Sequence, residues 1–208
     1  MLVEAAVESL GAAQAAAEGG AHRIELCADL AHGGTTPLLE LPKVPIPVYV
    51  LIRPRAGDFV YTGAEHRVML EQIHQAKAAG ARGIVTGALT STGQVDVARM
   101  AELIAAARPL GVTFHRAIDV STSITAALET LIALGVDRVL TSGGAKAAVL
   151  GLETIGRLVR QSAGRIVILA GGGIDASNAA RIVQKTGVQE IHFSVTIAQK
   201  VRDVLESL

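Results

Sequence analysis

The stretch GIVTGALTSTGQVDVARMAELIAAARPLGVTFHR, residues 83–116, decides the fold class of this chain. It opens with a short apolar run (83–86) and continues into an Ala- and Leu-rich segment with helical spacing (97–107). A second short run, rich in β-branched residues, closes it (112–116). Two strands that flank one helix form a βαβ unit, in which the strands run parallel.

The same succession of strand and helix recurs along the whole chain. The predicted strands are 2–6, 22–27, 48–53, 83–86, 112–116, 138–141, 165–170 and 190–195. The predicted helices are 7–18, 64–79, 97–107, 123–134, 147–161 and 176–185, with a last one running to 208. Repeated βα units form either a closed barrel or an open doubly wound sheet. Eight units favour an α/β fold of the TIM-type (β/α)8 barrel class, with residues 1–208 as a single domain.

One unit breaks the pattern, because the segment 28–47 after the second strand is rich in proline. Its prolines are Pro37, Pro42, Pro45 and Pro47. Such a density excludes a regular helix, so we expect the helix after strand 2 to be missing or reduced to one turn. The apolar residues of this segment must then cover the barrel wall, unless a partner subunit does so: Leu38, Leu39, Leu41 and Val44.

Charge and composition exclude several classes of protein. Lysine and arginine number 19, as do aspartate and glutamate, so the net charge is zero and no basic surface for nucleic acid is expected. A single cysteine excludes an internal disulfide framework and a CxxC zinc site. The N-terminus does not read as a signal peptide, and no apolar run is long enough to span a membrane. We therefore expect a cytoplasmic protein.

Polar side chains gather at the ends of the predicted strands, where TIM barrels carry their chemistry. Alternate residues share a face, and one face of these strand ends is polar. Its candidate residues are Glu25, Cys27, Arg53, Arg55, Thr86, His115, Thr141, His192 and Ser194. One interpretation is a closed ion-pair network in which Glu25 and Glu4 neutralise Arg53. The other is an anion-binding pocket, since Arg53 and Arg55 suit a carboxylate or a phosphate.

Two glycine-bearing turns follow late strands of the predicted barrel. They are Ser142-Gly143-Gly144 and Gly171-Gly172-Gly173. Backbone N–H groups exposed there would bind an oxyanion, although simple tight turns would give the same sequence. Neither a GxGxxG nor a GxxxxGK[ST] motif is present, so nothing supports a dinucleotide or a P-loop site.

The candidates for acid–base catalysis are Glu25, Asp58, His115, Asp119 and His192. Glu25 and His115 would exchange protons with the substrate, and Asp58 or Asp119 would orient a partner. His115 has a suitable intrinsic pKa and stands at a strand end.

The strand-end segments, taken in order, resemble the CutC family, which is named for copper homeostasis. The matching segments are Arg23-Ile-Glu-Leu-Cys27, Gly33-Gly-Thr-Thr-Pro37, Ile52-Arg-Pro-Arg-Ala-Gly-Asp-Phe59, Val85-Thr-Gly87, Val112-Thr-Phe-His-Arg-Ala-Ile-Asp119, Arg138-Val-Leu-Thr-Ser-Gly143, Ala170-Gly-Gly-Gly173 and Glu190-Ile-His192. The resemblance implies a TIM-type barrel, a cytoplasmic location, a homodimer or larger homo-oligomer, and copper ion binding. It implies no particular reaction.

Two main hypotheses for the function remain open at this point. In the first, the chain binds or senses copper through Cys27, assisted by His115 or His192, because Cu(I) prefers thiolate ligands. In the second, it is a lyase, isomerase or hydrolase acting on a small metabolite that carries phosphate or carboxylate. The same pocket without turnover, a metabolite-binding barrel, is a weaker third option. Apart from copper, no cofactor is expected.

Overall fold

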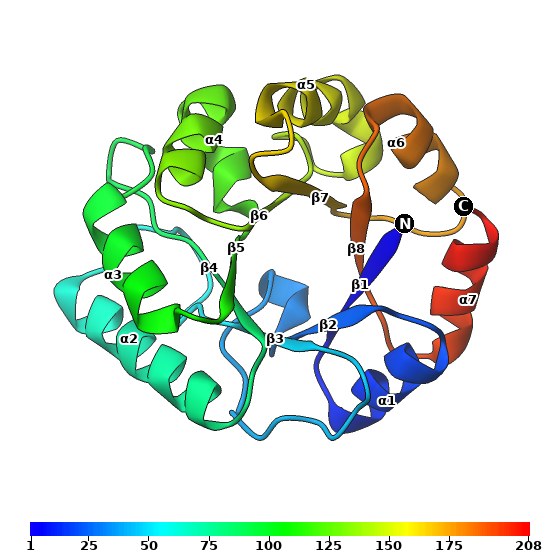
Figure 1. Cartoon of the computed structure of the whole chain (residues 1–208), viewed down its shortest axis with the longest axis horizontal. Helices are drawn as coiled ribbons and strands as arrows, with labels where there is room; N and C mark the ends of the chain where they lie inside the picture. Colours follow the sequence, from blue (N-terminus) through cyan, green and yellow to red (C-terminus); the bar gives the residue numbers. More distant parts are fainter.

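The computed structural model describes residues 1–208 as a closed, eight-stranded barrel of parallel strands. Each strand pairs with the next one along the chain, and β8 closes the barrel by pairing with β1. Helices surround the strands on the outside (Figure 1). The TIM-type barrel predicted from the repeated βα units is therefore confirmed, and the open doubly wound sheet is excluded.

The observed elements follow the predicted ones within a few residues. The strands are β1 (Leu2–Val7), β2 (Arg23–Leu26), β3 (Val48–Leu51), β4 (Gly83–Thr86), β5 (Gly111–Phe114), β6 (Arg138–Thr141), β7 (Val167–Gly171) and β8 (Glu190–Ser194). The helices are α1 (Leu10–Glu18), α2 (Gly63–Ala78), α3 (Val97–Ala107), α4 (Ile124–Ala133), α5 (Leu152–Ser162), α6 (Ala179–Thr186) and α7 (Ala198–Glu206). None of these helices combines the length and the apolar character needed to cross a membrane.

Between β2 and β3 the only helical structure is a single 3₁₀ turn, Leu30–His32. The predicted loss of the helix after strand 2 is thus confirmed, and the Pro-rich segment takes its place on the barrel wall. Leu39, Leu41 and Val44 pack against the main hydrophobic core. Leu38, in contrast, points into solvent with 88% of its surface exposed. In Figure 1 this segment runs as an irregular chain below β3.

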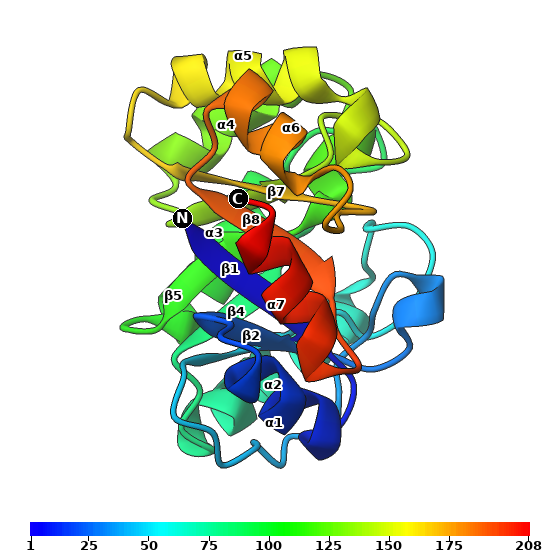
Figure 2. The ribbon, with the colours of Figure 1, turned by 90° about the vertical axis from the view of Figure 1, so that its right-hand side faces the viewer.

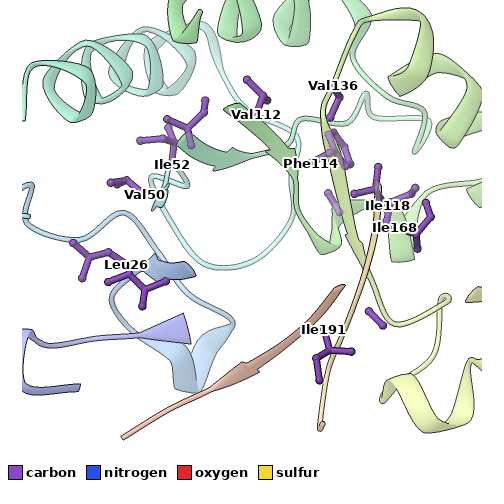
Figure 3. Packing of buried hydrophobic residues seen from close by; sticks show 14 of the residues in the cluster. Leu26, Val50, Ile52, Val112, Phe114, Ile118, Val136, Ile168 and Ile191 are labelled. Atoms are coloured by element: carbon purple, nitrogen blue, oxygen red, sulfur yellow. The ribbon is translucent and has the colours of Figure 1, made fainter. Parts of the chain in front are cut away.

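The main hydrophobic core lies between the barrel and its helices. Figure 2 shows the ribbon of the barrel and helices from the side. The core is almost entirely aliphatic, and Phe114 is its one fully buried large aromatic side chain. Figure 3 shows Val50, Ile52 and Val112 in this cluster. Because strand side chains alternate, the residues between these positions point into the barrel.

The inside of the barrel is polar at the N-terminal ends of the strands. The guanidinium groups of Arg23 and Arg138 lie over the ring of Tyr49, at 5.0 and 5.5 Å from its centre. Both arginines bind the carboxylate of Glu190, through hydrogen bonds of 2.8 and 2.7 Å. Gly83 leaves the space that the Tyr49 ring occupies, since a Cβ there would stand 2.1 Å from a ring carbon.

We expect Gly83→Ala to destabilise the fold by about 1–3 kcal/mol, because the added methyl group displaces the Tyr49 ring from its contacts with the two arginines. Urea unfolding followed by circular dichroism measures the change. The matched control is Gly11→Ala in α1, where a Cβ would meet nothing within 4 Å. That variant should be unchanged or more stable by up to about 1 kcal/mol. Equal stability of the two variants would show that Tyr49 tolerates displacement.

Candidate functional site

A cavity of 360 Å³ opens at the C-terminal ends of the strands. Among the residues predicted for the site, those that line it are Glu25, Arg53, His115, Gly172, His192 and Ser194. Arg116, Asp175 and Lys200 line it as well, although the sequence did not single them out. The remaining lining is partly apolar and includes Leu30, Leu51, Phe59, Leu140, Ile174 and Phe193.

Several predicted site residues lie outside the lining of this cavity. They are Cys27, Arg55, Asp58, Thr86, Asp119, Thr141, Ser142, Gly143 and Gly171. For Thr86 and Thr141 the reason is the alternation along the strand. Thr86 shares the face of Ile84, which packs in the outer core, and its hydroxyl donates to the carbonyl of Ile52. On β6 it is Leu140 that lines the cavity, so its neighbour Thr141 faces the other way.

Arg55 and Asp58 pair with each other beside the barrel mouth. Arg55 Nη2 lies 2.8 Å from Asp58 Oδ1, and its Nε lies 2.5 Å from Glu65 Oε1. The β3 strand already ends at Leu51, so the alternation that placed Arg55 beside Arg53 does not extend past Pro54. The expectation that both arginines face one ligand therefore does not match the geometry.

Arg53 lines the cavity, but most of its guanidinium is bound to loop carbonyl groups. Nη1 donates to the carbonyl of Gly34 at 2.7 Å, and Nη2 donates to that of Gly57 at 2.9 Å. Neither Glu4 nor Glu25 pairs with Arg53, contrary to the ion-pair interpretation of the sequence. Arg53 is thus a residue that fixes two loops at the barrel mouth.

The turn after β6, expected to bind an anion, already binds one of the protein's own carboxylates. Asp119 accepts hydrogen bonds from the backbone N–H groups of Ser142 and Gly144, both at 3.0 Å. The hydroxyl groups of Thr141 and Ser142 and the Nε of Arg116 also donate to it. Asp119 is consequently a structural anion that orders this turn. The N–H of Gly143 donates to the hydroxyl of Thr141, so no N–H of the turn is left for a ligand.

The turn after β7, in contrast, has backbone N–H groups that are not bound within the protein. The N–H groups of Gly172, Gly173 and Ile174 have no acceptor in the protein, and all three residues line the cavity. Gly172 and Gly173 have φ angles of +105° and +69°, which glycine adopts without strain. Successive N–H groups in a turn suit an anion, and we refer to Gly172–Ile174 as the nest.

Arg116 provides a positive charge next to this nest. Its Nε and Nη2 are bound to Asp119 and Ser142, but its Nη1 has no acceptor. A Cβ built on Gly172 would stand 3.3 Å from that Nη1, so Arg116 lies against the glycine turn. In the sequence, Arg116 could have been recognised from its place directly after His115, at the end of a predicted strand. Lys200 has no such position, because it lies in the last helix.

A chain of charged groups crosses the strands β1, β2 and β8 just below the cavity. Glu4 binds Arg23 through one carboxylate oxygen, and its Oε1 lies 2.8 Å from Nδ1 of His192. The Nε2 of His192 lies 3.5 Å from Oε2 of Glu25. No other hydrogen-bond donor of the protein reaches the carboxyl group of Glu25, so its oxygens are available to a ligand.

Burial and charge give these groups different proton affinities. Burial alone would raise the pKa of Glu4, but the hydrogen bond to His192 and the charge of Arg23 outweigh it and lower that pKa to about 2. Burial raises the pKa of Glu25 to about 7, against the opposing charge of His192. Burial would lower the pKa of His192, but its hydrogen bond to Glu4 and the charge of Glu25 raise it. Near neutral pH, Glu25 therefore exists in both protonation states.

His115 is less suited to accept a proton than the sequence implied. Burial lowers its pKa to about 3, and the nearby charge of Arg53 acts in the same direction. Its Nδ1 accepts a hydrogen bond from the N–H of Ala117, which leaves the proton of the neutral ring on Nε2. That Nε2 has no partner in the protein. His115 can thus donate a hydrogen bond, but it is a weak base.

The residues present do not fit a copper ion within one chain. Cys27 is fully buried inside the barrel against Ala6, Leu51 and Val85, outside the cavity lining. Its thiol lies 3.5 Å from the carbonyl oxygen of Val7, and burial raises its pKa. No group of three His, Cys, Asp or Glu side chains is arranged to hold a metal ion. A buried, protonated thiol is a poor Cu(I) ligand.

Comparisons with known proteins agree on one family. Residues 1–197 match the model of the CutC family. The chain is 49% identical over 207 residues to a human protein named copper homeostasis protein cutC homolog, covering 97% of this chain and 75% of that protein. It is also 49% identical to the family protein CutC of Xanthomonas campestris pv. campestris, covering 93% of this chain and 83% of that protein.

A solved structure of the same family has the same fold. The crystal structure of a CutC protein from Streptococcus agalactiae superposes with a TM-score of 0.87 at 35% identity, covering 92% of this chain and 97% of that one. Mandelate oxidase superposes with a TM-score of 0.67 at 16% identity, covering 99% of this chain and 71% of that one. This second likeness shows the barrel fold alone.

The raised pKa of Glu25 predicts a pH-dependent cost to stability. The folded protein binds the Glu25 proton more tightly than the unfolded chain, so stability falls as pH rises from 4.5 to about 7. Glu25→Gln removes this loss. The unfolding free energy of Glu25→Gln minus that of the wild type should therefore be about 2 kcal/mol larger at pH 8 than at pH 5. Urea unfolding at both pH values measures the difference, with Glu153→Gln, an 88% exposed side chain, as the control that should parallel the wild type.

We expect the thiol of Cys27 to react slowly with an aromatic disulfide reagent in the native protein and at once in urea, because its side chain is inaccessible. In a competition titration with a Cu(I)-selective chelator, Cys27→Ala and the wild type should behave alike. A large loss of Cu(I) affinity in Cys27→Ala would instead assign copper binding to this residue and contradict the geometry.

Proposed function

The chain belongs to the CutC family, whose barrel it shares, and we propose that it binds a small phosphate- or carboxylate-bearing metabolite at the barrel mouth. The family name points to copper homeostasis, and human and bacterial relatives carry it. The donor set around Cys27 supports no copper ion in one chain, so the proposal rests on the cavity instead.

One observation carries this proposal. The unpaired N–H groups of Gly172, Gly173 and Ile174 and the free Nη1 of Arg116 belong to residues that line one cavity. Hydrogen-bond donors without protein acceptors favour an oxyanion there, and phosphate sites in TIM barrels lie beside the late strands β7 and β8. Lys200 in α7 adds a second positive charge on the same side.

The remaining lining supports a small organic ligand rather than a bare ion. A volume of 360 Å³ lies within the range of small-molecule pockets. Leu30, Leu51 and Phe193 give the cavity apolar walls, while Glu25 and His192 give it polar groups away from the nest. Such a pocket suits a metabolite with an anionic end and a short polar body.

Isothermal titration with inorganic phosphate, and separately with succinate, tests the anion site. We expect at least one of the two anions to bind the wild type, and Arg116→Ala to weaken that binding by about 10- to 100-fold, because a charged hydrogen bond is lost. Lys200→Ala should weaken it several-fold through the loss of a partly screened charge.

The matched control is Arg55→Ala, which removes an arginine at the mouth that is bound to Glu65 and Asp58. Its anion affinity should equal that of the wild type. Equal affinity of Arg116→Ala, Lys200→Ala and the wild type, or no binding of either anion, would refute the assigned site.

A further inference from the structure

Glu25 is a buried carboxyl group whose oxygens are open to a ligand. The residue lies on β2 with 5% of its surface exposed, and it lines the cavity. Its nearest donor in the protein is Nε2 of His192, at 3.5 Å, which is too long for a firm hydrogen bond. Buried carboxylates in structural roles accept several hydrogen bonds, as Asp119 does here. Glu25 has no such partners in the protein, so the hydrogen bonds of the fold do not account for its burial.

His192 is held in one orientation by the strand next to it. Glu4 and His192 are directly paired residues of β1 and β8, and Nδ1 of His192 lies 2.8 Å from Oε1 of Glu4. The second oxygen of Glu4 is bound to Arg23, so the carboxylate cannot turn away. A carboxylate at Nδ1 favours the protonated ring and leaves the Nε2–H directed to the side of Glu25.

The anion nest stands beside this pair. Gly171 and His192 are directly paired residues of β7 and β8, and a Cβ on Gly171 would stand 3.3 Å from Cβ of His192. An anion bound at Gly172–Ile174 therefore places the rest of its molecule next to His192 and Glu25. Ser194, the hydroxyl residue of the lining, has no hydrogen bond to a base, which leaves the site without an activated nucleophile for hydrolysis.

We propose that Glu25 and His192 catalyse a proton transfer within a phosphorylated α-hydroxy carbonyl compound, so that this barrel is an aldose–ketose isomerase. The proposal rests on the proposed function, because the phosphate must sit in the nest of Gly172–Ile174. Glu4 acts as a positioning residue, since it touches His192 and not the substrate.

The reaction needs no co-reactant. The Glu25 carboxylate removes the proton from the carbon that bears the hydroxyl group, and the electron pair of that C–H bond forms the double bond of an enediol. The carbonyl oxygen meanwhile takes a proton from Nε2 of His192. Glu25 then returns its proton to the former carbonyl carbon, and the other oxygen gives its proton back to His192. A carboxylate base paired with an imidazole donor is suited to this chemistry.

The test is exchange of substrate C–H for deuterium, followed by proton NMR in D₂O. The probes are the phosphates of three- to six-carbon sugars: glyceraldehyde 3-phosphate, dihydroxyacetone phosphate, ribose 5-phosphate, ribulose 5-phosphate, glucose 6-phosphate and fructose 6-phosphate. We expect at least one aldose–ketose pair to exchange and interconvert. Glu25→Gln should lose about 100- to 10,000-fold of that rate, and His192→Asn about 100-fold. Asp58→Asn, an exposed carboxylate outside the cavity, should keep the wild-type rate.

Phosphate affinity separates the possible failures. Glu25→Gln should bind inorganic phosphate as the wild type does, which shows that it is folded and that only the chemistry is lost. If the wild type binds phosphate but exchanges none of the six probes, the isomerase is refuted and the anion site stands. Exchange that persists in Glu25→Gln refutes the assigned base. If succinate binds and phosphate does not, the isomerase of a phosphorylated sugar is refuted while the anion site stands. If neither anion binds, the proposed function fails and the isomerase fails with it.

Restoring a carboxylate distinguishes a base from a structural residue. Glu25→Asp should recover part of the exchange rate that Glu25→Gln loses, while KM changes little. For Glu4, Glu4→Gln should lower kcat more than it raises KM, because it weakens the hold on His192 without touching the substrate. Equal exchange rates for Glu25→Asp and Glu25→Gln would show that the carboxylate at this position does not transfer the proton.

Discussion

The buried contacts of Glu4 with Arg23 and His192 are the interactions on which the interior of this barrel depends. Glu4 is fully buried on β1, where an unpaired carboxylate would be strongly unfavourable. Arg23 from β2 and His192 from β8 neutralise it, and Glu190 joins Arg23 to Arg138 on β6. The ion pairs therefore link strands on opposite sides of the barrel. They also set the orientation of His192 and the environment of Glu25 at the cavity.

This polar interior follows from the composition of the chain. With three Phe, two Tyr and no Trp, the barrel has few large side chains to fill its centre. Tyr49 fills part of it, in space left by Gly83 and Gly111, and its ring lies beneath the two arginines. The aliphatic residues are instead used outside, where the strands meet the helices and curved apolar surfaces pack well. Structural charges lie at the bottom of the barrel, and the charges open to a ligand lie at the top.

Alternation along the strands predicted which side some candidate residues face, but not others: Thr86 and Thr141 are the last residues of β4 and β6, and neither lines the cavity. Glu25 and His192 belong to well-formed strands, and both line the cavity. Arg55 lies beyond Pro54, where the chain turns away, while Arg116 enters the lining from the 3₁₀ turn after β5. The two glycine turns look alike in sequence. Only the structure shows that Asp119 occupies the first and leaves the second open.

The sequence by itself determined the succession of eight βα units, the loss of one helix to prolines, and the family, because these depend on local propensity and ordered motifs. Tertiary structure alone decided which charges pair with one another. Glu4 meets Arg23 because β1 pairs with β2, and it meets His192, 188 residues away, only because β8 closes on β1. In the closed barrel Cys27 is enclosed among aliphatic side chains. Glu25, two residues earlier on the same face, lines the cavity. Which neighbour a side chain meets depends on strand register and barrel shear, and no local pattern encodes either of these.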